Sequence, residues 1–106
     1  APAAAAAVAA RFDCVLDCID GADAKTDLLA VCRAAACPVV TVGAAGGKRR
    51  PELVTAADLT RTQQDKLLFW VRKSLRQHHN FPRPKSPTKP GKPWGVRAVY
   101  SPEPAA

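Results

Sequence analysis

Acidic residues interrupt an apolar stretch near the start of the chain, which reads DCVLDCIDG over residues 13–21. Its last carboxylate, Asp20, is followed at once by Gly21. If the stretch is a strand, Asp20 lies at the carboxyl end, where open α/β sheets bind their ligands. A carboxylate at that place can hold a magnesium ion, which in turn binds nucleotide phosphates. The alternative is that Asp20 only caps the following helix, and both interpretations stay open.

An earlier carboxylate in the same stretch is expected to do something else. Asp17 lies three residues before Asp20, so in a regular strand the two side chains point to opposite faces. We therefore expect Asp17 to meet a basic group or a backbone donor rather than to share a metal ion with Asp20.

The second candidate is the glycine-rich stretch GAAGG at residues 43–47. Its glycines, Gly43, Gly46 and Gly47, could let a substrate approach the backbone amides closely. The stretch lacks the G-x-G-x-x-G spacing of dinucleotide sites, and Lys48 lacks the Ser or Thr partner of a P-loop. A flexible turn at the end of a strand is the alternative.

The elements that must position these residues form a strand-helix-strand pattern. Residues 13–19 and 38–42 are short apolar runs, typical of parallel strands buried on both faces. Residues 22–36 place apolar side chains on one helical face. The sequence thus predicts an α/β fold with a βαβ unit and a right-handed crossover.

The rest of the chain adds elements of more mixed character. Residues 62–79 have helical apolar spacing after a T-x-x-D start typical of a capping box, and residues 52–57 and 94–100 read as strands. Residues 80–93 contain five prolines and four bases, which predicts an extended or disordered loop outside the core. The predicted organisation is a flexible Ala-rich lead-in (1–11), a partial α/β domain (12–79), the loop (80–93), and a strand with its tail (94–106).

Charge is distributed unevenly along the 106 residues, a length that suits one domain. Residues 1–40 carry three bases and five acids, a net charge of −2, whereas residues 48–97 carry thirteen bases and three acids, a net charge of +10. This asymmetry indicates a polyanionic partner such as RNA or DNA, with a solvated basic surface as the alternative.

The positions of the cysteines and the length of the apolar runs indicate the cellular compartment of the protein. The cysteines at positions 14, 18, 32 and 37 lie in strand-like and helical runs rather than on zinc knuckles, which favours buried free thiols and a reducing compartment. No run reaches transmembrane length, and the Ala-rich start lacks the features of a secretory signal. We expect a cytoplasmic or organellar (mitochondrial) protein that is not secreted.

Four stretches in a fixed order carry a resemblance to a known family. DCVLDCIDG, LLAVCRAAACPVVTVGAAGG, VTAADLTRTQQDKL and WGVRAVYSPE resemble tRNA threonylcarbamoyladenosine dehydratases of the ThiF/MoeB superfamily, whose relatives include the ubiquitin-activating enzymes. The resemblance runs from Phe12 to Glu103 and is broken only by the proline-rich loop. It implies a partial Rossmann-like fold with an incomplete sheet, and it implies ATP, magnesium and tRNA as ligands.

The resemblance also implies roles for individual residues. The second aspartate of the D-x-x-D pattern lies near magnesium and the adenylate in relatives, so Asp20 is implied as the catalytic and metal-binding residue. Contact with the nucleotide is implied for Lys25, Gly43, Gly46 and Gly47. The bases expected to hold tRNA phosphates are Arg61, Lys66, Arg72, Lys73 and Arg76.

The implied activity is the ATP-dependent cyclisation of threonylcarbamoyladenosine next to the anticodon, through adenylation of its carboxylate. The family's glycine-rich ATP loop does not occur in this sequence, so the chain is expected to be inactive alone. A homodimer or the remainder of the enzyme would then be a partner. The alternatives are a non-catalytic RNA- or protein-binding remnant of the same fold, and an enzyme that adenylates a sulfur-carrier or ubiquitin-like protein.

Overall fold

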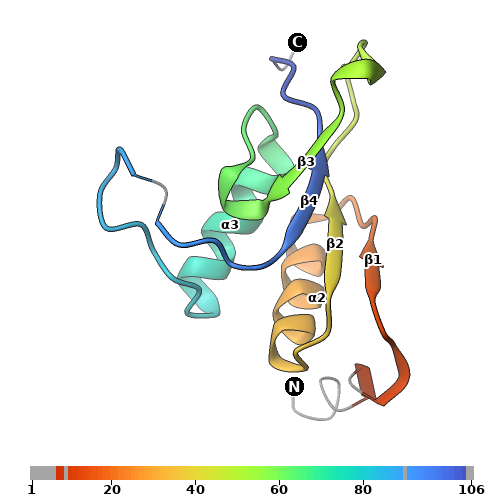
Figure 1. Cartoon of the computed structure of the whole chain (residues 1–106), viewed down its shortest axis with the longest axis vertical. Helices are drawn as coiled ribbons and strands as arrows, with labels where there is room; N and C mark the ends of the chain where they lie inside the picture. The colour runs from red at the N-terminus through yellow and green to blue at the C-terminus, as the bar shows by residue number, and fades with distance from the viewer. Residues whose placement is uncertain (1–6, 9, 90, 105–106) are drawn as a thin grey trace.

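The computed structural model describes residues 7–8, 10–89 and 91–104. In that part of the chain, four strands form one sheet of order β1-β2-β4-β3, with helices α2 and α3 on one side (Figure 1). The elements are β1 (Val15–Asp17), α2 (Ala22–Ala34), β2 (Val39–Val42), β3 (Thr55–Asp58), α3 (Lys66–His78) and β4 (Arg97–Tyr100), with short 3₁₀ turns at Pro51–Leu53 and Leu59–Arg61.

The predicted βαβ unit is present. Strand β1 pairs in parallel with β2, placing Asp17 opposite Thr41, and α2 connects the two strands. Strand β4 adds in parallel to β2, and β3 closes the sheet antiparallel to β4. The carboxyl ends of β1, β2 and β4 therefore meet at one edge of the sheet, which we call the carboxyl edge.

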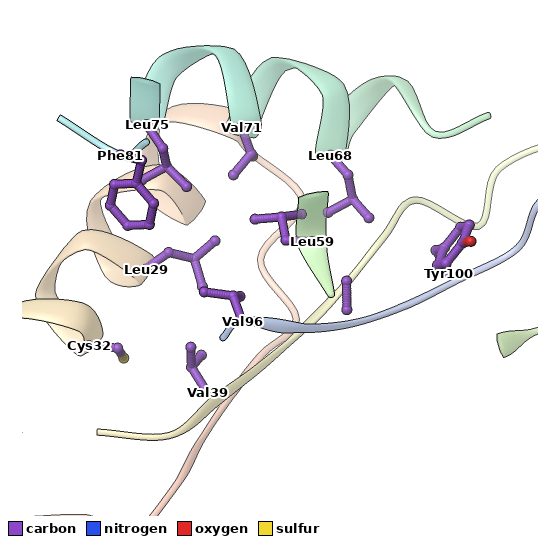
Figure 2. Close-up of a cluster of buried hydrophobic side chains, with 11 residues drawn as sticks. Leu29, Cys32, Val39, Leu59, Leu68, Val71, Leu75, Phe81, Val96 and Tyr100 are labelled. Atoms are coloured by element: carbon purple, nitrogen blue, oxygen red, sulfur yellow. The ribbon is translucent and has the colours of Figure 1, made fainter. Parts of the chain in front are cut away.

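The core lies between the sheet and its two helices. Side chains from α2 and α3 point toward one another and toward the sheet (Figure 2). Burying a leucine or valine side chain contributes on the order of 1.5–3 kcal/mol, so these contacts hold both helices in place. The buried apolar residues are Leu29, Cys32, Cys37, Val39, Leu59, Leu68, Val71, Leu75, Phe81, Val96, Ala98 and Tyr100.

The opposite face of the sheet is open, which corrects the prediction of a strand buried on both faces. Strand β1 contains three residues, and Leu16 at its centre is 72% exposed. Val42 on β2 is also exposed. The physical reason is that α2 and α3 share one side of the sheet and β1 is an edge strand, so no described element covers the other side.

The start of α3 also differs from the prediction. The helix begins at Lys66, and its N-cap is Asp65, whose side chain accepts a hydrogen bond from the Leu68 N–H. The predicted capping box starting at Thr62 is wrong, because the Thr62 hydroxyl donates to the Leu59 carbonyl in the preceding 3₁₀ turn.

The proline-rich segment 80–93 projects away from the sheet in Figure 1 and holds no helix or named strand in its described residues. It is not wholly outside the core, however. Phe81 is 3% exposed and its ring lies 4.9 Å from that of Trp94. At the other end, residues 7, 8, 10 and 11 are helical where a flexible lead-in is predicted, and residues 1–6 and 9 lie outside the described residues.

The four cysteines are free thiols, but only two are buried. Cys32 and Cys37 are buried as predicted, and burial raises the pKa of the Cys32 thiol; Cys14 and Cys18 are exposed because β1 is short and lies at the sheet edge. Over the described ranges, no helix is long and apolar enough to cross a membrane.

Candidate nucleotide site and basic helix face

A buried ionic network fixes the loop that follows β1. The Asp17 carboxylate is fully buried; it accepts hydrogen bonds from the Ile19 N–H at 3.0 Å and the Thr41 hydroxyl at 2.7 Å. Its Oδ2 also lies 3.0 Å from the Lys25 ammonium. The prediction that Asp17 meets a basic group and a backbone donor is confirmed.

The nucleotide contact implied for Lys25 requires an accessible ammonium group, but Lys25 is buried in this structure. Its side chain is fully buried, and besides the Asp17 carboxylate it donates to the carbonyl oxygens of Ile19 at 3.0 Å and Asp17 at 3.4 Å. The ammonium therefore has no surface open to a nucleotide in this structure. Because Lys25 is in the first turn of α2, it ties that helix to the end of β1.

Asp20 lies directly beyond this fixed loop and is exposed. The N-cap of α2 is Gly21, in extended backbone, so Asp20 is not the predicted alternative helix cap. Among the described residues, no hydrogen bond or ion pair involves the Asp20 carboxylate. The loop is thus held rigidly while this one acid is left free.

The donor set around Asp20 limits which metal chemistry it could support. No group of three or more His, Cys, Asp or Glu side chains gathers to hold a metal ion in the described part of the chain. Magnesium is commonly held by one or two carboxylates together with substrate phosphates. The residues present therefore fit magnesium only as one carboxylate that completes a metal–nucleotide complex.

A close approach of Asp65 explains the first glycine of the 43–47 stretch. The Asp65 carboxylate accepts from the Ala44 N–H at 2.9 Å and from the Leu68 N–H at 2.9 Å, so it joins the loop to the start of α3. A Cβ atom at Gly43 would lie 2.9 Å from the Asp65 Cγ and closer still to its Oδ2. Gly43 is therefore required by packing, whatever it contributes to a ligand.

The other two glycines of the stretch are exposed. A Cβ at Gly46 would meet nothing within 4 Å. Gly47 has a φ of 77°, the left-handed region that favours glycine.

A clamp between Lys48 and Glu103 holds the end of this loop, and the sequence reasoning missed it. The Lys48 ammonium donates to the carbonyls of Gln64, Ser101 and Glu103. The Glu103 carboxylate accepts from the Arg49 N–H at 3.0 Å and the Arg50 N–H at 3.2 Å. These hydrogen bonds, led by that from Arg49, lower the pKa of Glu103.

A cavity of about 360 Å³ opens beside the clamp at the carboxyl edge. Val42, Val54 and Val99 give it an apolar lining, while Arg49 and Arg50 add positive charge. Gly43 is among its lining residues, but Asp20, Gly46 and Gly47 are not. Asp20 and the glycine-rich loop therefore lie at the same edge, but this cavity does not include Asp20.

The basic residues expected to bind tRNA divide into two groups. Arg72, Lys73 and Arg76 line one hollow of about 280 Å³ on the outer side of α3. Arg61 and Lys66 do not line it; Arg61 instead donates to the Gly91 carbonyl at 2.8 Å, and Lys66 is exposed at the start of the helix.

Two arginines of the hollow are held in position by neighbours. Arg72 donates to the Thr62 hydroxyl, and the Arg76 guanidinium lies 5.1 Å from the centroid of the Trp94 ring. Burial lowers the pKa of both arginines, yet a guanidinium remains charged at neutral pH.

The sequence reasoning missed three further lining residues, Phe69, Gln77 and Arg83. Phe69 could have been found from the sequence, because this aromatic residue lies outside the helical stripe of buried residues.

Comparison with known proteins decides the relationship. The tRNA threonylcarbamoyladenosine dehydratase of Haemophilus influenzae is 38% identical over 93 residues, which are 88% of this chain and 34% of that protein. The protein of the same name from Escherichia coli is 35% identical over 92 residues, 87% of this chain and 32% of that one. This chain is homologous to part of tRNA threonylcarbamoyladenosine dehydratase.

Solved structures agree with this relationship. Crystal structures of the E. coli dehydratase, TcdA, in complex with AMP and with ATP match 99% of this chain and 41% of TcdA, with a TM-score of 0.81 and 30% identity. The predicted resemblance and the partial Rossmann-like fold of the ThiF/MoeB type are confirmed. No protein-family model matches the chain.

The match covers only part of each relative. The chain spans about a third of the length of the curated dehydratases that it matches. Both of these dehydratases are bacterial, so the comparisons give no support to the mitochondrial alternative.

Proposed function

We propose that this chain takes part in the ATP-dependent cyclisation of threonylcarbamoyladenosine in tRNA. The observation that carries the proposal is the free Asp20 carboxylate at the carboxyl edge, on a loop that Asp17 and Lys25 fix. Support comes from the dehydratase homologues and from the E. coli structures that contain AMP and ATP.

In this proposal, a cation held by Asp20 would balance negative charge while ATP reacts with the modified nucleoside. A carboxylate oxygen of the modified nucleoside attacks the α-phosphorus of ATP, and pyrophosphate leaves. A nucleophilic group of the same side chain then attacks the activated carbonyl carbon, the ring closes as that group loses its proton to water, and AMP leaves. Asp20 would hold magnesium against the phosphates, whose negative charge must be balanced while these bonds change.

The basic face of α3 would hold the tRNA. Arg72, Lys73 and Arg76 can contact phosphates without reading sequence, so binding should weaken steeply as salt rises. The proposed reaction brings ATP and tRNA together. It would use Asp20 on the nucleotide side and the basic face of α3 on the RNA side.

The test uses a chimera in which this chain replaces the matching segment of the E. coli dehydratase. We expect Asp20→Asn to lower the yield of cyclised nucleoside, measured by mass spectrometry of digested tRNA, by about 100-fold or more, the scale for losing one electrostatic contact in a reaction. Binding of tRNA, measured by filter retention, should change less than about twofold, since Asp20 lies off the basic face.

The matched control is Asp13→Asn, because Asp13 is exposed in the same segment. It should leave the yield unchanged. Full activity of the Asp20→Asn chimera would reject the role of Asp20, and a folded but inactive unmodified chimera would reject the proposed activity.

A second candidate is a non-catalytic RNA-binding role. It is favoured by one observation, that the cavity at the carboxyl edge does not include Asp20. It predicts that the chimera binds tRNA, fails to cyclise it, and shows no magnesium-dependent binding of ATP. The third alternative, adenylation of a sulfur-carrier or ubiquitin-like protein, gains nothing from the two dehydratase homologues.

A further inference from the structure

Two large aromatic side chains on α3 point away from the core. Phe69 is 49% exposed and Trp70 is 52% exposed, whereas the buried stripe of the helix consists of Leu68, Val71 and Leu75 (Figure 2). The two exposed rings meet edge to face, with centroids 5.3 Å apart at 80°. Two adjacent aromatic residues that are both half exposed form an apolar patch on the outside of the helix, which is typical of a contact surface.

The hollow beside Phe69 is strongly cationic. Its lining contains the side chains of Arg72, Lys73, Arg76 and Arg83, and Gln77 adds an amide. The Arg72 guanidinium lies 5.9 Å from the Phe69 ring centroid. Of the described residues that line this hollow, none is a carboxylate. The site thus offers an aromatic ring, four positive charges and one neutral hydrogen-bonding group.

The hollow on the Trp70 side is different. It is lined by Asp23 together with Trp70, Lys73, Ser74 and Gln77, and the Lys73 ammonium lies 5.2 Å from the Trp70 ring centroid. The carboxylate of Asp23 disfavours a phosphate there. An anionic ligand is therefore expected on the Phe69 side, with Trp70 supporting the Phe69 ring.

We propose that the Phe69 side of α3 is a stacking platform for unpaired RNA bases, in which Phe69 stacks on a base while Arg72, Arg76 and Arg83 hold the adjoining phosphates. Stacking on aromatic and Arg side chains combined with cationic contacts to the backbone is how proteins take single-stranded RNA. The inference deepens the proposed function, on which it rests, by assigning the loop nucleotides of the tRNA rather than its helices to this face.

RNA fits these observations better than an acidic protein segment does. A protein partner could pair its carboxylates with the four cations, but it would give the half-exposed Phe69 ring no planar group of matching size unless it also supplied an aromatic residue. An unpaired nucleotide supplies a planar base and a phosphate in one unit. Gln77 can then donate to or accept from the edge of that base.

The experiment measures binding of the 106-residue chain to three probes: a short RNA hairpin with an unpaired loop, a blunt RNA duplex with the same number of phosphates, and heparin. We expect the hairpin to bind most tightly. Phe69→Ala should weaken hairpin binding about 5- to 100-fold, the scale for losing one stacked base, and leave duplex and heparin binding unchanged.

Two variants make the comparison specific. Phe69→Tyr keeps the ring and should retain hairpin affinity. Phe12→Ala removes an aromatic side chain that is 55% exposed but lies outside α3, and it should have no effect. Because Phe69 and Phe12 are both about half exposed, neither alanine variant should unfold the chain, which circular dichroism checks.

The outcomes separate this inference from the proposed function. Hairpin binding that is equal in the parent and in Phe69→Ala overturns the stacking platform but leaves phosphate contacts to tRNA in place. A parent chain that binds no RNA also overturns the stacking platform, whereas the proposed activity is judged separately by the chimera. Tighter binding of a glutamate-rich peptide than of the hairpin, weakened by Phe69→Ala, would identify a protein-docking face and overturn the inference.

Discussion

Two charged side chains at the carboxyl edge of the sheet are buried and paired with each other, whereas those on the outer face of α3 are exposed or half-buried. At the edge, Asp17 and Lys25 are fully buried and paired, and Asp65 accepts two backbone N–H groups. On α3, Lys73 is exposed, and Arg72 and Arg76 are half-buried beside aromatic rings.

This difference agrees with the roles that we propose for the two regions. A buried ion pair costs desolvation energy and holds its partners in one geometry, which suits the positioning role that we propose for the loop before Asp20. Exposed cations hold phosphates at little cost in geometry, and they give affinity that salt can screen. The carboxyl edge is thus suited to positioning a catalytic side chain, and the outer face of α3 is suited to binding RNA phosphates.

The largest expected effect comes from breaking the buried pair. Lys25→Met leaves the Asp17 carboxylate buried without its cation, which should lower the free energy of unfolding by about 3–5 kcal/mol, measured by urea denaturation. Lys66→Met, which removes an exposed cation on α3, should change it by less than about 0.5 kcal/mol. Equal effects of the two substitutions would show that the pair does not stabilise the edge.

A smaller effect should separate two glycines of the same loop. Gly43→Ala forces the Asp65 carboxylate away from the Ala44 and Leu68 amides and should cost about 1–3 kcal/mol, again by urea denaturation. Gly46→Ala, where a Cβ meets open space, should cost less than about 0.5 kcal/mol. A harmless Gly43→Ala would mean that the loop and α3 are not tied at Asp65.

The smallest effect concerns the support beneath the helix face. Asp58 accepts from the N–H groups of Thr60, Trp94 and Gly95, and so fixes Trp94 below Arg76. Burial raises the pKa of Asp58, but the hydrogen bond from the Thr60 hydroxyl and those from these three N–H groups together lower it below its usual value. The stability that the carboxylate contributes is therefore complete above about pH 4 and is lost as pH falls through the lowered value.

Asp58→Asn should accordingly lower the melting temperature at neutral pH, and the difference from the parent should shrink as the pH is taken below about 4. Thermal unfolding followed across pH measures this. If the difference in melting temperature between the parent and Asp58→Asn stays constant down to pH 2, the charge of Asp58 is not the cause of the lower stability.

The sequence predicted the parts of the fold that depend on local pattern. The βαβ unit and the core stripe of α3 follow from apolar spacing, and both are present. The pairing of Asp17 with a base was also predictable, because a strand alternates its faces. Asp20 was recognisable as a candidate because a glycine follows it at the end of the predicted strand, although β1 itself ends at Asp17.

What could not be predicted depends on contacts distant in sequence. Nothing in the pattern shows that both helices cover one side of the sheet, which leaves Leu16 exposed. Nothing in the local pattern shows that Lys25 is buried, and only the folded structure encloses its ammonium beside Asp17. Arg83 joins the hollow on α3 from a segment that composition alone predicts to be an extended or disordered loop.

The clamp at Glu103 has a consequence for the order in which the protein acquires its shape. The amides of Arg49 and Arg50 are bound by an acid 54 and 53 residues downstream. During synthesis, the βαβ unit can form while those amides still face water. The two hydrogen bonds that fix these amides beside the cavity can therefore form only after the ribosome has added Glu103.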